Sequence, residues 1–279
     1  MKTLLLALLT SAAASAASVS DHLGLELWSL HALADKSGPQ AALAETEALG
    51  FRYVEGGPPA GMSVDAYKAE LARHRIEIVS MGVDYAALAR DVSASVATAK
   101  ALGVQYVMLA WVPHEGDTFT EAEALKASGD FNAWGAAFRA AGIGFTYHAH
   151  GYEFRPRAGG GTLFDLIAQR TNPEFVNFEM DVFWVTHGGQ DPVALMKKYP
   201  TRWKMMHVKD IRRGAPTGLY TGHAPATDDV VVGTGQVDWP SVLAQARAVG
   251  VDWYFIEDES TDPIGHIPRS VAYLATVKP

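Results

Sequence analysis

The sequence contains no cysteine among its 279 residues. Disulfide bonds, thiolate metal sites and cysteine nucleophiles are therefore excluded, so metal ligands must be imidazole nitrogens or carboxylate oxygens. Basic residues are also few, because 23 Lys and Arg stand against 31 Asp and Glu and leave a net charge of −8. Proteins that bind nucleic acids usually present a basic face to the phosphate backbone, so we expect no nucleic-acid partner.

Long apolar runs are missing except near the N-terminus. There, Lys2 precedes the run 4–9, and small residues with an Ala-x-Ala-like sequence at 14–16 follow through Ala17. These features are typical of a secretory signal peptide, and the run is too short to cross a bilayer comfortably. We therefore expect a signal peptide over 1–17, a mature domain over 18–279 and a periplasmic or secreted protein that keeps no membrane anchor after processing. An uncleaved N-terminal anchor is the alternative.

The sequence also lacks a glycine-rich turn that would bind phosphate. A doubly wound dinucleotide-binding sheet needs such a turn after its first strand, where this chain has Leu27-Trp28-Ser29-Leu30. The glycines at 159–161 are not followed by the Lys and Ser or Thr of a P-loop. A doubly wound sheet is therefore the less favoured α/β fold.

A joint between a helical pattern and an apolar run recurs along the chain, with Gly50, Gly103, Gly142 and Gly250 at the joints. Glycine just past a helix end adopts the left-handed conformation at little cost, and the apolar run is typical of a buried parallel strand. Eight strands alternating with helices predict a single-domain (β/α)8 TIM barrel. The expected strands are 24–29, 51–56, 76–82, 104–110, one within 143–154, 175–181, 203–208 and 253–257. The expected helices are 38–49, 63–74, 91–102, 119–141, 162–170, 191–199, 240–249 and 266–276.

In such barrels the active site lies at the carboxyl ends of the strands. That rule brings together the polar and aromatic residues that end the predicted strands or follow them closely: Trp28, Glu55, Trp111, His148, His150, Glu153, Asp181, His207, Lys209 and Glu257. The connection 211–238 is the longest and is rich in Gly, Thr and Asp. A structureless loop of that length is typical of a lid or a binding loop.

Four of these residues predict a metal site. Each has an ordinary explanation when taken alone: Asp181 could cap a helix, and Glu257 could belong to a solvated acidic turn. Found together at one rim, they predict a single divalent ion such as Mn²⁺, Co²⁺, Zn²⁺ or Mg²⁺. The predicted ligands are His148, Asp181, His207 and Glu257.

The fifth strand leaves one ligand assignment open. Residues i and i+2 of a strand share a face, so His148 and His150 point the same way and Glu153 follows on the loop. Register favours His148 as the ligand, because it lies about as far into its strand as His207 does into its own. Glu153 is then free as a base, although the reverse assignment remains open.

Catalytic and substrate-binding roles follow from the same rim. Glu153 or Glu257 is the expected base, His150 can move a proton, and Lys209 is either an acid or oxyanion ligand or the partner of Asp210 in a salt bridge. Trp28, Trp111 and Trp184 either pack the rim or form a stacking wall for a sugar ring. The expected substrate-binding residues are Trp28, Glu55, Trp111, Trp184 and Arg212.

Five segments resemble the xylose-isomerase-like TIM barrel superfamily, in its sugar phosphate isomerase/epimerase branch: 147–154, 178–184, 207–210, 233–239 and 255–257. The resemblance implies one divalent metal held by a ligand from each of strands 5 to 8, as in ketose epimerases and inosose dehydratases. Two positions depart from the epimerases, which have Glu in place of His148 and His in place of Trp184. The DNA-repair endonucleases of the superfamily need that second His, which argues against their activity here.

These observations predict metal-assisted proton abstraction next to a carbonyl, on a small-molecule carbohydrate. The outcome is epimerisation or isomerisation, with elimination by a lyase or hydratase acting on 3-keto-glycosides or inosose-like sugars as the alternative. Export predicts a non-phosphorylated substrate. A sugar-binding barrel without catalysis and a metal-free structural barrel stay open, and so does assembly into a homo-oligomer.

Overall fold

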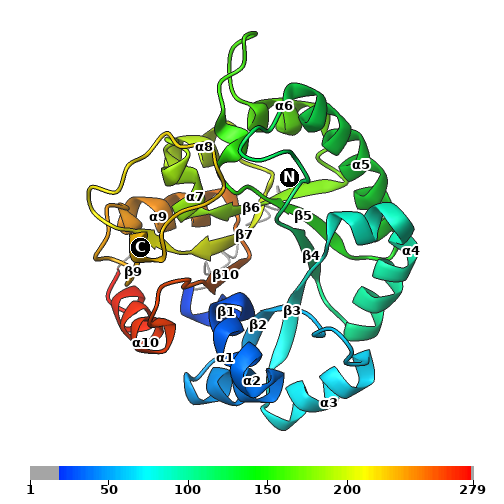
Figure 1. Cartoon of the computed structure of the whole chain (residues 1–279), viewed down its shortest axis with the longest axis vertical. Helices are drawn as coiled ribbons and strands as arrows, with labels where there is room; N and C mark the ends of the chain where they lie inside the picture. The colour runs from blue at the N-terminus through cyan, green and yellow to red at the C-terminus, as the bar shows by residue number, and fades with distance from the viewer. Residues whose placement is uncertain (1–18, 278–279) are drawn as a thin grey trace, which may run out of the picture.

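The computed structural model describes residues 19–277. Eight parallel strands close into a barrel in the order β1-β10-β7-β6-β5-β4-β3-β2, with helices around it (Figure 1). The predicted single-domain TIM barrel is therefore confirmed, whereas the predicted signal peptide lies outside the described residues. The barrel strands are β1 (Leu23–Glu26), β2 (Tyr53–Gly56), β3 (Glu77–Gly82), β4 (Tyr106–Leu109), β5 (Gly144–His148), β6 (Val176–Asp181), β7 (Trp203–Val208) and β10 (Trp253–Ile256).

All eight predicted helices form, and two short helices that the sequence did not predict, α1 and α7, are added within 19–277. Helix α4 begins six residues before the predicted position 91 and is kinked at Asp91, whose backbone is not helical. The helices are α1 (His31–Ser37), α2 (Pro39–Ala48), α3 (Val64–Arg73), α4 (Tyr85–Leu102), α5 (Glu121–Ala140), α6 (Leu163–Arg170), α7 (Val182–His187), α8 (Pro192–Lys198), α9 (Trp239–Val249) and α10 (Pro263–Leu274).

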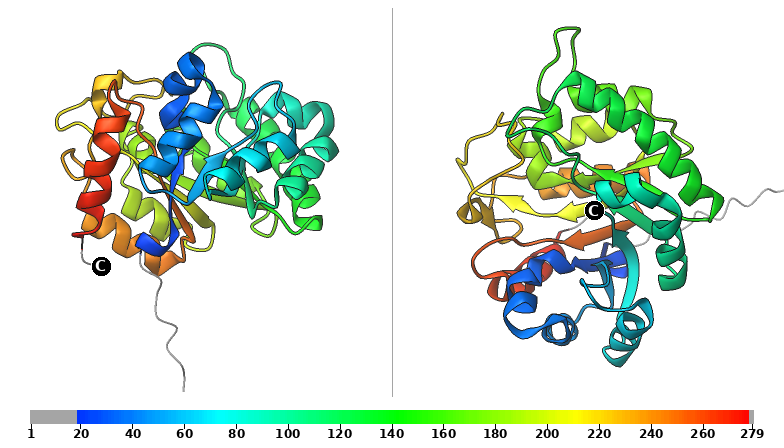
Figure 2. Two further views of the ribbon diagram at one scale, coloured as in Figure 1. Left: turned by 90° about the horizontal axis from the view of Figure 1, so that it is seen from below. Right: turned by 45° about the vertical axis from the view of Figure 1, so that its right-hand side comes forward.

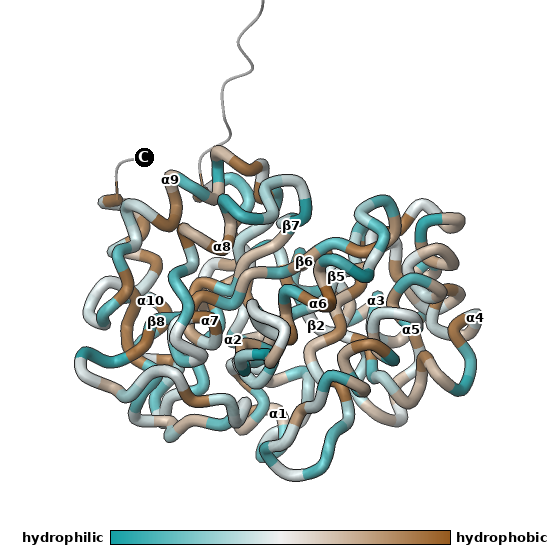
Figure 3. Tube along the Cα trace, turned by 90° about the horizontal axis from the view of Figure 1, so that it is seen from above, coloured by the Kyte–Doolittle hydropathy of each residue, from teal (hydrophilic) through white to brown (hydrophobic). Residues whose placement is uncertain are grey.

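Local sequence explains where these helices begin and end. Gly103 and Gly250 follow α4 and α9 in the left-handed conformation, with φ of 79° and 77°. Thr120 and Thr162 open α5 and α6 with reciprocal capping boxes, in which each side chain satisfies a free backbone N–H. Figure 3 shows apolar and polar residues alternating along the outer helices, as expected for helices that pack one face on the strands.

Two segments of the rim differ from the prediction. The first strand ends at Glu26 because the chain turns into a 3₁₀ helix, η2 (Leu27–Leu30), so Trp28 lies on this turn. The connection after β7 is not structureless, because β8 (Asp210–Ile211) pairs antiparallel with β9 (Asp229–Val230). Figure 2 shows this connection, in yellow to orange, at the end of the barrel opposite to η1 (Val19–His22).

The barrel interior is divided along its axis. Its amino-terminal half is apolar and is filled by Val79, Met108, Met205, Trp253 and Phe255. Its carboxyl-terminal half instead contains buried acidic and imidazole groups, described below. Within 19–277, no helix is long and apolar enough to cross a membrane.

Candidate functional site

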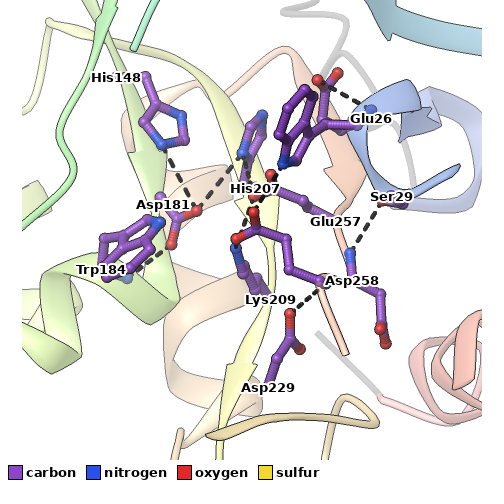
Figure 4. Close-up of polar contacts among 12 residues, drawn as sticks. Glu26, Ser29, His148, Asp181, Trp184, His207, Lys209, Asp229, Glu257 and Asp258 are labelled. Carbon is purple, nitrogen blue, oxygen red and sulfur yellow. Dashed lines mark hydrogen bonds and ion pairs between the residues drawn. The ribbon is translucent and has the colours of Figure 1, made fainter. Parts of the chain in front are cut away.

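The predicted metal ligands converge at the carboxyl end of the barrel. His148 and Asp181 are the last residues of β5 and β6, His207 lies opposite Asp181 in the β6–β7 register, and Glu257 directly follows β10. Ligand atoms of His148, Asp181 and His207 all lie within 4.8 Å of one another. Figure 4 shows these three side chains turned toward each other, with Glu257 beside His207. We call these four residues the strand-end cluster.

The two oxygens of Asp181 have different surroundings. Oδ1 accepts a hydrogen bond of 2.8 Å from the backbone N–H of Trp184, so Asp181 does cap helix α7. Oδ2 has no hydrogen-bond partner and faces Nε2 of His148 at 3.7 Å and Nδ1 of His207 at 3.5 Å. The cap therefore fixes the carboxylate and leaves one oxygen directed into the cluster.

Each imidazole of the cluster also lies beside a carboxylate from outside the four residues, Glu55 for His207 and Glu179 for His148. Nε2 of His207 lies 2.7 Å from Oε1 of Glu55, and its Nδ1 lies 3.0 Å from Oε2 of Glu257. Nδ1 of His148 faces Oε2 of Glu179 at 3.4 Å, without a hydrogen bond. A ring N–H held by a carboxylate orients an imidazole and leaves its second nitrogen free for a metal. Nε2 of His148 and Nδ1 of His207 are the nitrogens that face Oδ2 of Asp181.

Several polar atoms here are buried without a partner. They include both ring nitrogens of His148, both carboxylate oxygens of Glu179, Oδ2 of Asp181 and Oε2 of Glu55. Leaving buried polar groups unpaired is costly, and a cation among them would satisfy them. Two imidazoles and two carboxylates without a thiolate form a donor set that suits Zn²⁺, Mn²⁺ or Co²⁺, so the residues present fit a divalent ion.

Two of the four proposed ligands, His148 and Glu257, have protonation states that fit a metal site, whereas the carboxylates around His207 outweigh its burial and raise its pKa well above the usual value. Burial, reinforced by the neighbouring His207, holds the pKa of His148 well below its usual value, so this imidazole is neutral. Burial would raise the pKa of Glu257, but Lys209 and His207 outweigh it and hold that pKa well below the usual range. Glu257 is therefore an ionised carboxylate, the form in which it binds a metal.

Sequence reasoning missed two acidic residues inside the barrel, Glu26 and Glu179, which are 8% and 1% exposed. Burial and the nearby Glu55 raise the pKa of both carboxyls well above the usual value. Glu179 could have been found, because it lies two residues before Asp181 and therefore faces the same side of β6. Together with Glu55, these residues surround the strand-end cluster with acidic groups on its interior side.

A cavity of about 380 Å³ opens at the same rim. Its lining includes all three tryptophans of the predicted aromatic wall, Trp28, Trp111 and Trp184. Binding of a sugar to them stays a prediction. His150 and Lys209 line it as well, and residues 222–226 of the connection after β7 form another side. The ring of His150 lies 4.7 Å from that of His148, which connects the cavity to the cluster. We call this space the tryptophan cavity.

His150 and Lys209 carry opposite protonation states in the tryptophan cavity. Burial lowers the pKa of His150 to about 3, so its imidazole is neutral, and Nδ1 has no partner. Burial would lower the pKa of Lys209, but Glu257 and Glu259 raise it well above the usual value. Lys209 is therefore a charged ammonium that contacts both carboxylates, with Nζ 3.3 Å from Oε2 of Glu257.

The partner of Lys209 is not Asp210, its neighbour in sequence. The carboxylate of Asp210 instead accepts hydrogen bonds from Gly233 N–H at 2.8 Å and from the indole N–H of Trp239 at 3.0 Å. These bonds fasten the connection after β7 to the start of α9. The predicted alternative of a Lys209–Asp210 salt bridge is therefore wrong, because the two side chains point to opposite sides of the chain.

The structure places Glu153 away from the strand-end cluster. Its carboxylate accepts the Tyr147 hydroxyl and the backbone N–H of His150, at 3.1–3.2 Å for the latter. Tyr147 is adjacent to His148 in β5 and so faces the opposite side, where its ring packs 4.7 Å from Phe131 of α5. Glu153 thus lies between the barrel and the helices, and burial raises its pKa to about 7. Its role as a base stays a prediction.

Two predicted substrate-binding residues also lie outside the lining of the tryptophan cavity. Glu55 is fully buried below the cluster, where it contacts His207. Arg212 binds Oδ1 of Asp228 through Nε at 2.9 Å and Nη2 at 2.6 Å. Neither side chain belongs to the lining of the tryptophan cavity in this structure, and direct binding of a substrate by either stays a prediction.

A model of the family described as xylose isomerase-like TIM barrel matches residues 43–277. The chain belongs to that family. Curated relatives include an inosose dehydratase from Lacticaseibacillus casei, which is 24% identical over 164 residues covering 56% of this chain and 54% of the relative. Inosose dehydratase 2 from Bacillus cereus is 32% identical over 96 residues, covering 34% of this chain and 31% of the relative. The chain spans about half the length of the curated relatives it matches, or less.

Solved structures show the same fold. A sugar phosphate isomerase/epimerase from Parabacteroides distasonis superposes with a TM-score of 0.74 at 23% identity, covering 97% of this chain and 98% of that one. The IolI protein, solved with a bound zinc atom, gives 0.70 at 16% identity and covers 92% and 97%. An L-ribulose 3-epimerase gives 0.66 at 12% identity and covers 91% and 93%. These likenesses show the fold, and the family model confirms the predicted resemblance to the xylose-isomerase-like TIM barrel superfamily.

Proposed function

We propose that this protein is a metal-dependent enzyme that abstracts a proton next to the carbonyl of a non-phosphorylated keto-sugar, as isomerases and epimerases do. The observation that carries the proposal is the strand-end cluster, whose unpaired imidazole and carboxylate atoms lie beside a tryptophan-lined cavity. Nε2 of His148, Oδ2 of Asp181, Nδ1 of His207 and Oε2 of Glu257 would hold the ion. A divalent ion bound there polarises a carbonyl and stabilises the negative charge that develops on its oxygen.

His150 is the base that the geometry favours. Its ring is held by the backbone carbonyl of Ala110 and lies between the indoles of Trp111 and Trp184, at 5.8 and 5.2 Å between ring centroids. A neutral imidazole with one free nitrogen is in the protonation state that a general base requires. Glu257 is the alternative base, but its carboxylate is already engaged by His207 and Lys209.

The charges around the tryptophan cavity support a sugar without phosphate. Lys209 is balanced by Glu257 and Glu259, and both Glu259 and Asp229 belong to the cavity lining. A phosphate dianion would meet these carboxylates without an uncompensated cation to bind it. A neutral sugar ring instead stacks on indole faces and accepts or donates hydrogen bonds at its edges. Export through the segment 1–17, which we also propose, fits the same class of substrate.

Elimination is the second candidate outcome, and Lys209 favours it. Once His150 has taken the proton next to the carbonyl, the ammonium of Lys209 can protonate an oxygen that leaves from the neighbouring carbon. The C–O bond breaks, a C=C bond forms, and water or an alcohol is released. The matched curated relatives, which are named inosose dehydratases, support this outcome further.

The test combines metal analysis of the purified protein with proton exchange in D₂O on a panel of keto-sugars and keto-glycosides. We expect about one divalent ion per chain and incorporation of deuterium next to the carbonyl. Exchange with an epimeric or isomeric product supports the first outcome, and loss of water or alcohol supports elimination. Stoichiometric metal and sugar binding without any exchange would identify a binding protein and refute the catalytic proposal.

A further inference from the structure

A second cavity of about 370 Å³ lies at the same rim, over the ends of β1, β2 and β3 and against α1 and α2. Its walls are mainly apolar and include Leu27, Ala34, Leu43 and Pro59. Trp28 lines both this space and the tryptophan cavity, so one indole separates two cavities of similar size. Neither the strand-end cluster nor the proton transfers described above use this second cavity.

Trp28 forms a fixed partition although its side chain is 53% exposed. His31 stacks on it with ring centroids 4.5 Å apart and planes at 14°, and its indole N–H donates to Oε1 of Glu259 at 2.8 Å. His31 lines the second cavity and Glu259 lines the tryptophan cavity. An exposed indole held from both sides is pre-organised for contact with a ligand, since little side-chain freedom remains to be lost on binding.

The second cavity also contains unpaired polar groups. Oε2 of Glu26 and the hydroxyl of Tyr67 are buried without a hydrogen-bond partner, and both residues belong to its lining. Tyr67 is 2% exposed and Glu26 is 8% exposed. Apolar walls with two unpaired polar atoms suit a flat ring that carries a hydroxyl group.

We infer that the second cavity binds the aglycone of a glycoside, as an aromatic ring whose attached sugar lies in the tryptophan cavity. This inference rests on the proposed function, because it assumes that the sugar ring occupies the space beside the strand-end cluster. The glycosidic oxygen then lies near the edge of Trp28, where the two cavities meet. The substrate is accordingly a two-part molecule, a keto-sugar joined to an apolar ring, and a free monosaccharide fills only half of the site.

Calorimetric titration of the metal-loaded protein with phenyl and methyl glucosides of the same anomeric configuration, taking each anomer in turn, tests the inference. The two ligands differ only in the aglycone. We expect the phenyl glucoside of one anomer to bind about tenfold more tightly than its methyl counterpart. Equal affinities in both series, or no binding of any of the four ligands, would overturn the inference.

Variants that fill the second cavity test whether the preference for the phenyl glucoside arises there. Ala34→Trp places a large ring in the cavity from α1, and Gly82→Leu adds a side chain at the end of β3, where a Cβ meets no atom within 4 Å. Both should abolish the preference for phenyl and leave the affinity for the methyl glucoside unchanged. Ala32→Trp, on the exposed side of the same helix, is the matched control and should keep the preference.

The inference and the proposed function fail separately. A protein that prefers the phenyl glucoside but catalyses no exchange keeps the aglycone site and refutes the enzyme. A protein that exchanges protons on keto-monosaccharides but binds both glucosides equally keeps the enzyme and overturns the aglycone site. Retention of the phenyl preference in both cavity-filling variants would also overturn it.

Discussion

The imidazole of His207 lies with Nε2 2.7 Å from Oε1 of Glu55, on the opposite side of the ring from Asp181. Because Glu55 can hold the proton on Nε2, it orients Nδ1 into the strand-end cluster. Glu55 therefore acts on the metal site through His207, and direct contact with an ion or a substrate is not needed for its effect.

Replacing Glu55 by Gln should weaken metal binding without removing a ligand. A neutral amide holds the imidazole N–H less strongly than a carboxylate does, so we expect the affinity to fall by about 10- to 100-fold. Titration against a competing chelator measures the effect. Glu174→Gln, at a side chain that is 67% exposed, is the matched control and should change nothing. An unchanged affinity in Glu55→Gln would show that the contact with His207 is only structural.

Removing a ligand should have a larger effect. We expect Glu257→Gln and His207→Ala each to lose the stoichiometric ion, because each deletes one of the four proposed donor atoms. Elemental analysis after dialysis gives the metal content, and circular dichroism checks that each variant is folded. Full retention of metal in both variants would mean that the ion, if present, is bound elsewhere.

Replacing His150 by Gln should separate metal binding from catalysis. The side chain lines the tryptophan cavity but is not among the proposed ligands, so we expect normal metal content with exchange slowed by about 10²- to 10⁴-fold. His74→Gln, at the opposite end of the barrel and paired with Glu47, is the matched control. Exchange at the normal rate in His150→Gln would assign the base to another group, with Glu257 the next to test.

Glu153 should make folding stability depend on pH. Burial raises its pKa from 4.5 to about 7 in the folded protein. As the pH rises from about 4.5 to about 7, the unfolded chain loses this proton while the folded chain keeps it, so the free energy of unfolding falls. Above the folded pKa the loss is complete, and it amounts to roughly 3 kcal/mol at 1.36 kcal/mol per pKa unit.

Glu153→Gln should remove that dependence. The amide keeps the shape of the protonated carboxyl and cannot ionise. Urea unfolding of both proteins from about pH 5 to about pH 8, with a chelator present so that metal binding does not contribute, measures the difference. The stability of the wild type should decline relative to that of the variant across this range. Parallel curves would show that Glu153 is already ionised in the folded protein.

Predictions from the sequence were most accurate where a local pattern has a single physical meaning. Glycines such as Gly103 end helices because they adopt positive φ at no cost, and apolar runs between them form buried strands. Period-2 alternation then places His148 and Asp181 on the inner face at the strand ends. These rules sufficed to predict the barrel and the convergence of His148, Asp181 and His207.

Other features depend on residues that are distant in sequence. Glu153 follows the same strand as His148, yet its position is decided by the hydroxyl of Tyr147 and by the packing of that ring on α5. Lys209 pairs with Glu257 and Glu259 because β7 and β10 are neighbours in the closed barrel, whereas the adjacent Asp210 faces the other way.

The sequence by itself determined the βα repeat, the barrel and the identity of the strand-end residues, because backbone periodicity is set by neighbours along the chain. The tertiary structure alone decided which carboxylates stand behind His148 and His207, where Glu153 lies, and that Trp28 divides two cavities. Those relationships arise from side chains that meet across the closed barrel. Their distances depend on strand register and loop packing, which no local pattern encodes.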